Sequence, residues 1–188
     1  GAPLVFDTST INSRQSMGTA TNYDTGNQPQ YLVWAEEFTT ATSLRIYAVS
    51  NRLTNPTTQF VTVNVPSYSH PADPPQMGTS SRPELFEARF WSAVVRDGQL
   101  WATHHQGQQR AKVRWYQFDL AGWPSSGNNP SLVQSGDIVL GAGISTFFGS
   151  IWVDAAQNMA LSFARSSSSE FISMNMAYRK ASDPLGTT

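Results

Sequence analysis

The chain has 188 residues, 39% of them hydrophobic, which is enough to bury a sizeable core within one domain. Charged residues make up only 13%, against the ~25% usual in soluble domains, so neutral polar side chains solvate the surface. Lysine is nearly absent, and a formal net charge of −1 supplies no field that would attract nucleic acid or an anionic membrane.

Several classes of site and anchor are excluded by missing residues. No cysteine is present, so the chain has no disulfide, no thiolate metal site and no cysteine nucleophile. No run approaches the ~18 apolar residues that a membrane-spanning helix needs. A nucleophile elbow, a phosphate-binding loop, a zinc helix and a calcium loop are all absent. We therefore expect neither a metal nor another cofactor, and no membrane span.

Pairs of expected strands recur along the chain. Each pair contains two apolar, β-prone segments separated by a polar break. Trp34-Ala35 in the first pair aligns with Trp101-Ala102 in the second. The pairs are residues 30–37 with 43–50, 98–105 with 111–119, and 158–165 with 171–179. This spacing indicates an internal repeat.

An additional strand and a tight turn precede each pair. Arg96-Asp97-Gly98 follows a strand expected at 90–95, and a turn at 154–158 follows a strand expected at 148–153. Turns with Asp-Gly or Asn between apolar segments favour β-hairpins. Residues 24–27 occupy the same place in the first copy.

Fourth strands are expected at 59–65 and 138–140, and the third copy ends before one. Helical periodicity competes only weakly, so the sequence predicts an all-β protein. Four-stranded antiparallel units in series are typical of β-propeller blades, here as repeats at approximately 17–66, 90–141 and 147–188 of a single domain, 1–188. A two-sheet sandwich or an irregular β fold is the alternative.

A closed propeller needs about four to eight blades, and this chain holds about three. The remaining blades of the ring would have to come from another chain or from further residues of the same chain. Either a second copy forms a homodimer with it, or these residues belong to a longer chain. The similarity between residues 181–187 and 72–79 favours the longer chain.

The run Ser-Ile-Trp-Val-Asp-Ala-Ala-Gln-Asn-Met-Ala-Leu-Ser-Phe-Ala-Arg-Ser at 150–166, with the ending at 178–187, resembles repeats of large secreted bacterial proteins predicted to form sialidase-like β-propellers. The resemblance covers chiefly residues 90–188. It implies a propeller in an exported protein, but not one activity, because such propellers include both hydrolases and binding modules. The family's Ser-x-Asp-x-Gly-x-Thr-Trp turn is absent, since only Asp97, Gly98 and Trp101 resemble it.

Candidate catalytic residues lie where the copies differ, just before the second loop of each repeat. Glu36-Glu37, His104-His105 and Arg165 occupy these strand ends. Equivalent propeller loops share one face around the channel, so these groups would meet there. Glu36 or Glu37 would act as general acid or base, His104 as its partner and Arg165 as an anion clamp. The alternative is that they are unrelated polar loop ends.

Candidate ligand-binding residues follow the second histidine. Arg110, Lys112 and Arg114 are spaced by two and would share one strand face, which with Trp115 could bind an acidic glycan or the carboxylates of another protein. His105 would point away from its neighbouring histidine, so the pair would not bind one metal. The alternative for the basic residues is a charged strand face that discourages edge pairing.

The leading hypothesis is a non-catalytic extracellular propeller module that binds a protein or glycan ligand or serves in assembly. A glycan-processing hydrolase or lyase, and a subunit of an extracellular filament or surface layer, are the alternatives. Low lysine and abundant serine, threonine and asparagine favour a secreted or cell-surface location in a bacterium.

Overall fold

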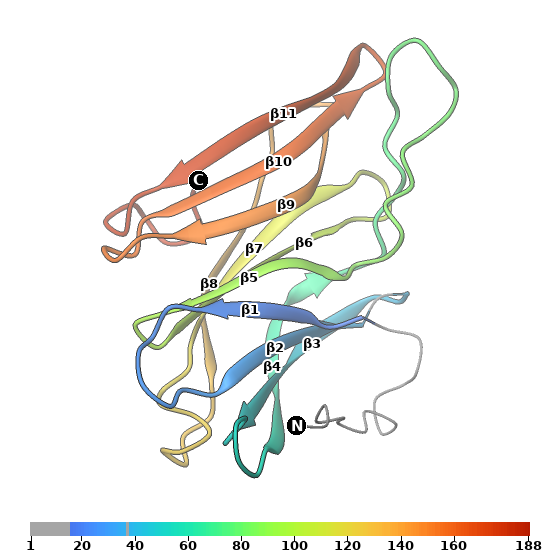
Figure 1. The fold of residues 1–188 in the computed structure, drawn as a ribbon. Coiled ribbons are helices and arrows are strands. Elements are labelled where there is room, and N and C mark those ends of the chain that lie inside the picture. The colour runs from blue at the N-terminus through green and yellow to red at the C-terminus, as the bar shows by residue number, and fades with distance from the viewer. Residues whose placement is uncertain (1–15, 37) are drawn as a thin grey trace.

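A computed structural model describes residues 16–36 and 38–188. These residues form eleven strands and no helix, which confirms the all-β class (Figure 1). The described part of the chain thus contains no helix that could cross a membrane.

The strands follow one another as three antiparallel meanders. The first meander is β1 (Gly18–Asn22), β2 (Gln30–Ala35), β3 (Ala41–Ser50) and β4 (Thr57–Tyr68). The second meander is β5 (Phe90–Arg96), β6 (Gln99–Gln106), β7 (Lys112–Asp119) and β8 (Ser131–Asp137). The third meander is β9 (Ser145–Val153), β10 (Met159–Ser167) and β11 (Glu170–Arg179).

The first two meanders are joined into one sheet. β1 pairs with β5 in parallel, so the strand order is β4-β3-β2-β1-β5-β6-β7-β8. The sheet is rolled until its outer strands, β4 and β8, come into contact, which makes it nearly closed and barrel-like. Separate four-stranded sheets were the expectation. The difference arises because the backbone of β1 bonds to β2 on one side and to β5 on the other.

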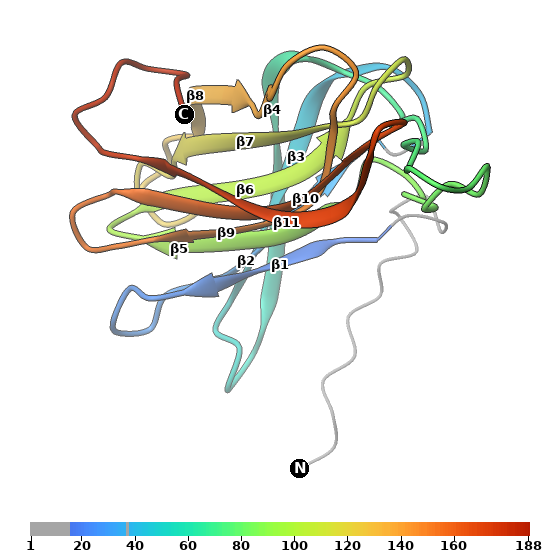
Figure 2. The ribbon, with the colours of Figure 1, turned by 90° about the horizontal axis from the view of Figure 1, so that it is seen from above.

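Two apolar cores hold the layers together. One core fills the barrel-like sheet and contains buried side chains of both meanders, among them Val33, Ile46 and Leu100. The other lies between the second and third meanders, where Trp101 and Leu161 are fully buried. Figure 2 shows the third meander lying over β5, β6 and β7, and β9 packs on these strands.

The expected strand pairs and turns agree closely with the structure. Asp97 and Gly98 have φ of 51° and 69° and form the two-residue turn between β5 and β6, a conformation that Asp-Gly adopts readily. One expected strand, 138–140, is wrong: β8 ends at Asp137, and its place in the ladder is taken by 131–137.

The two aligned tryptophans lie in different surroundings. Trp34 is on the outer face of the first meander with Tyr47, whereas Trp101 is fully buried beneath the third meander and stacks on Trp115. The two aligned tryptophans therefore do not have the same structural role, because the two faces of a strand contact different neighbours.

Candidate functional site

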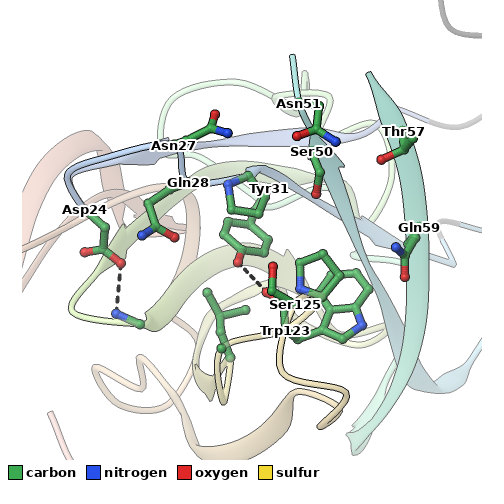
Figure 3. Close-up of a pocket in the computed structure, with 15 residues that line it drawn as sticks. Asp24, Asn27, Gln28, Tyr31, Ser50, Asn51, Thr57, Gln59, Trp123 and Ser125 are labelled. Atoms are coloured by element: carbon green, nitrogen blue, oxygen red, sulfur yellow. Dashed lines mark hydrogen bonds between the residues drawn. The ribbon is translucent and has the colours of Figure 1, made fainter. Parts of the chain in front are cut away.

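A pocket of about 610 Å³ opens at one end of the barrel-like sheet (Figure 3). It lies over the end of the first core, between the β1–β2 loop, the β3–β4 connection and the loop that follows β7. We call this the mouth pocket. Mouths of β-barrels are a common place for small-molecule sites.

Neutral polar side chains dominate the lining of the mouth pocket. They come from both meanders and supply amide and hydroxyl groups that both donate and accept hydrogen bonds. Pro29, Leu120 and Trp123 add apolar surface. The polar members are Asn27, Gln28, Ser50, Asn51, Thr57, Gln59 and Ser125.

Tyr31 and Trp123 hold the two walls of the mouth pocket together. The Tyr31 hydroxyl donates to the Trp123 carbonyl at 2.6 Å, and the two rings lie 6.3 Å apart. Burial, and to a smaller degree the charge of Asp24, raises the pKa of Tyr31 to about 12. The phenol therefore stays neutral and keeps its proton for the bond to the β7–β8 loop.

Asp24 is the one carboxylate among the lining residues, and its oxygens are engaged. They accept from the backbone N–H groups of Asp97 at 2.5 Å and Gly98 at 3.0 Å, tying the β1–β2 loop to the β5–β6 turn. Asp24 therefore has a structural role at the rim of the mouth pocket. The mouth pocket consequently offers a ligand mainly neutral hydrogen-bonding groups.

A second hollow, of about 660 Å³, is formed by the β6–β7 connection at the opposite end of the sheet. Gly107, Gln108, Gln109, Arg110 and Lys112 line it.

The candidate His104 is a core residue. It is fully buried, stacks on Phe90 at 4.9 Å, and contacts the Ala88 carbonyl through Nδ1 at 2.9 Å and the Tyr116 hydroxyl through Nε2 at 3.0 Å. A carbonyl only accepts, so Nδ1 carries the proton and Nε2 accepts from Tyr116. Burial lowers the pKa of His104 to about 3. The ring is therefore neutral and enclosed, with both nitrogens engaged.

His105 points to the other side of β6, as expected from strand alternation. Its Nε2 donates to the Leu85 carbonyl at 2.9 Å and its Nδ1 accepts from the Phe148 N–H at 3.3 Å. Burial lowers its pKa to about 4. This histidine fastens the connection before β5 and strand β9 to β6, and it is not exposed to a ligand.

Glu36 and Arg165, two other candidate catalytic residues, lie outside β6, the strand that carries His104. Glu36 follows β2, and its backbone N–H donates to the Tyr68 hydroxyl at 2.8 Å. Arg165 on β10 forms an ion pair with Glu170 at 2.7 Å across the β10–β11 hairpin. Neither lines either pocket. Glu37 lies outside the described residues.

The basic candidates on and before β7 have separate partners. Arg114 forms two bonds to the Asp137 carboxylate, at 2.6 and 2.9 Å, and Arg110 donates to the Gly141 carbonyl at 3.1 Å. Lys112 begins β7, beside Arg110 in the second hollow. Trp115 is fully buried against Trp101, so its ring is closed to a ligand.

Sequence reasoning missed the mouth pocket because its residues come from four connections far apart in the chain. A signal was present in the loop after β7, where Leu120-Ala121-Gly122-Trp123-Pro124-Ser125-Ser126-Gly127 sets a tryptophan among turn-forming residues. No group of three or more histidine, aspartate or glutamate side chains within residues 16–36 and 38–188 could hold a metal ion.

No protein-family model, curated protein or solved structure matches this chain. The resemblance to sialidase-like propeller repeats stays a prediction.

Proposed function

We propose that this chain is a non-catalytic binding module that takes a neutral glycan in the mouth pocket. The observation that carries the proposal is the lining: seven amide or hydroxyl side chains, the small exposed part of the buried Trp123 indole, and a single carboxylate already bonded to two backbone N–H groups. Sugar hydroxyls both donate and accept, as amides and hydroxyls do, and the C–H face of a sugar packs on aromatic surface.

The candidate acid–base residues favour binding over catalysis. A general acid or base must reach the substrate proton and have a pKa near the working pH. His104 is enclosed with a pKa of about 3, and Arg165 is paired with Glu170. Both lie away from the mouth pocket. A hydrolase or lyase acting in the mouth pocket would need groups other than His104 and Arg165.

We further propose that the meanders are blades of a propeller. β1 and β5 lie side by side and parallel, and the two meanders extend from them in opposite directions. If the first meander is superposed on the second, the face that points into the core in the first coincides with the face that points outward in the second. Neighbouring meanders thus stack front to back, which is the relation between neighbouring blades. The third meander continues the series, since its first strand, β9, packs on β5.

The location proposed for the module is outside a bacterial cell. The support is the surface chemistry: few charges, two lysines, no cysteine, and many neutral polar side chains. Detecting the native protein in culture supernatant or on intact cells, rather than in lysed cells alone, is the measurement that checks this location.

Binding is tested with a panel of neutral and acidic glycans on an array, followed by calorimetry on each hit. We expect neutral glycans to bind, and Gln59→Ala and Gln28→Ala each to weaken the Kd by about 3- to 10-fold, because each removes one hydrogen-bonding amide. Both side chains are exposed, so folding is kept. Gln108→Ala, at the second hollow, is the matched control and should leave the Kd unchanged.

Three results would count against the proposal: no binding across the panel, binding lost in Gln108→Ala but not in Gln59→Ala, or a preference for acidic glycans. Release of reducing ends from any glycan would instead support the enzymatic alternative.

A further inference from the structure

The outer face of the third meander is apolar and exposed. Along β11, alternate side chains point to this face: Ile172 is 44% exposed, Met174 70%, Met176 73% and Tyr178 55%. Trp152 on β9, 48% exposed, lies in the same row as Tyr178, since both pair with Ala160 of β10. An apolar face of this extent marks an interaction surface.

Two further features of this face point to a protein partner. Its other members, Ser150 and Ser162, are uncharged and lie in the row of Met176. In addition, β11 is an edge strand, because the third sheet has the order β11-β10-β9. Proteins usually blunt such an edge with charge or proline, and β11 has neither between Phe171 and Tyr178. A long apolar edge strand pairs readily with another sheet.

The opposite end of the stack carries a different face. On the outside of the first meander, Leu32, Tyr47 and Phe60 lie in one row across β2, β3 and β4, and Trp34 and Arg45 lie in the next. Arg45 is 4.7 Å above the Trp34 ring and 5.4 Å from the Phe60 ring, which is 58% exposed. Trp34 and Tyr47 are largely covered, at 8% and 4% exposed, so this face presents chiefly the Phe60 ring beside the Arg45 guanidinium.

We propose that the outer face of the third meander docks on the outer face of the first meander of a second copy of this chain. Inside the molecule the meanders stack face on face in series, with β9 of the third lying on β5, β6 and β7 of the second. If the series of stacked meanders continues beyond the third, the next sheet must resemble the first meander. A second copy presents that sheet, and its own third meander can return to the first copy.

The chemistry of the two faces suits this contact. Methionine side chains adapt to irregular surfaces and their sulfur packs well on aromatic rings, so Met174 and Met176 match the exposed ring of Phe60. Arg45 meets the ring of Tyr178, which attracts a guanidinium. The Trp152 ring already has the guanidinium of Arg96 5.9 Å from its centroid, so it is not the partner of Arg45. Because the two faces differ, the association is head-to-tail. Two copies form a closed pair when each contributes its first-meander face to one contact and its third-meander face to the other.

The inference rests on the stacking of the meanders and not on the mouth pocket, so its failure is separable from that of the glycan proposal. The test is light scattering of the 188-residue chain over a concentration series. We expect a dimer, and we expect Met176→Glu and Phe60→Glu each to give a monomer. Leu53→Glu, 89% exposed in the β3–β4 connection, is the matched control and should stay dimeric.

Mixing the two monomeric variants sharpens the test. Met176→Glu keeps a sound first-meander face and Phe60→Glu keeps a sound third-meander face, so their mixture should recover a heterodimer with one intact contact. A chain that stays monomeric at every concentration overturns the proposal. So does a Phe60→Glu variant that remains a dimer by itself, because the contact would then join two third-meander faces. Circular dichroism verifies that each variant is folded.

Discussion

The two ends of the barrel-like sheet divide its polar residues by role. At the mouth-pocket end, amides and hydroxyls line an open hollow of about 610 Å³. At the other end, two histidines and the Arg114–Asp137 pair are buried or nearly so, with their polar atoms bonded inside the protein. The titratable side chains at this end therefore hold the fold together, whereas the neutral amides and hydroxyls of the mouth pocket face the solvent.

The difference teaches that a titratable residue at a strand end is not by itself a site. A buried imidazole is stable only when it is neutral and bonded, and both histidines meet that condition. The mouth pocket instead collects groups that need no partner, because water solvates them when no ligand is bound.

Among the substitutions considered, removal of Arg114, at the end of the sheet opposite the mouth pocket, should have the largest effect on stability. Its guanidinium bonds Asp137 on β8 and also the carbonyls of Pro66 at 3.2 Å and Ser67 at 2.7 Å on β4, so it links the two outer strands of the barrel-like sheet. Its side chain is only 12% exposed. We expect Arg114→Ala to lower the free energy of unfolding by about 3 kcal/mol, measured by urea denaturation.

Arg110→Ala is the matched control, since Arg110 makes one bond to Gly141 at the surface. It should cost less than about 0.5 kcal/mol. Equal losses in the two variants would contradict the assignment of Arg114 as the link between β4 and β8.

Acid should destabilise the protein through the two histidines. In the unfolded chain their pKa is 6.5, and burial lowers it in the folded protein to about 3 for His104 and about 4 for His105. Between these values the unfolded chain binds more protons, so stability is complete above about pH 6.5 and falls as the pH is lowered. Denaturation at pH 7 and pH 5.5 should differ by about 1 kcal/mol per histidine.

The variant His105→Gln removes one of the two titrating groups and should halve that pH dependence. Stability that is unchanged between pH 7 and pH 5.5 in the parent chain would mean that the histidines are open to solvent. They would then be free to act in the way the enzymatic alternative needs.

At the mouth-pocket end, Tyr31→Phe tests the bond that joins the two walls. The phenylalanine keeps the ring but loses the hydroxyl that donates to the Trp123 carbonyl, which then lacks this partner. We expect a loss of about 1 kcal/mol in unfolding free energy, and a weaker Kd for any glycan that the pocket binds. Thermal denaturation with and without the glycan separates the two effects, and an unchanged melting temperature would exclude Tyr31 as a support for the loop.

The smallest effect is expected for Arg165. Its pair with Glu170 is partly solvated, with side chains 23% and 37% exposed, and such pairs contribute about 0–1 kcal/mol. Arg165→Ala should therefore change unfolding by less than about 1 kcal/mol and glycan binding not at all. A double-mutant cycle with Glu170→Ala measures the pair, and a large loss of binding in Arg165→Ala would restore it as a candidate anion clamp.

Local features of the fold were predictable from the sequence. The Asp97-Gly98 turn, the strand pairs of the three repeats and the opposite directions of His104 and His105 follow from turn chemistry and the two-residue period of a strand. The candidate site was less predictable. Repeat alignment selected strand ends with unlike charges, but whether such a group faces a core or solvent depends on the neighbouring sheet.

By itself, the sequence determined the all-β class, the three repeated units, the absence of thiol chemistry and the neutral polar surface, because these depend on composition and on contacts between residues close in the chain. Only the tertiary structure decided the rest. The parallel pairing of β1 with β5, whose partners such as Ala20 and Ala93 are 73 residues apart, rolls two repeats into one sheet. That roll buries His104 at one end, and at the other it brings together four distant connections as a pocket.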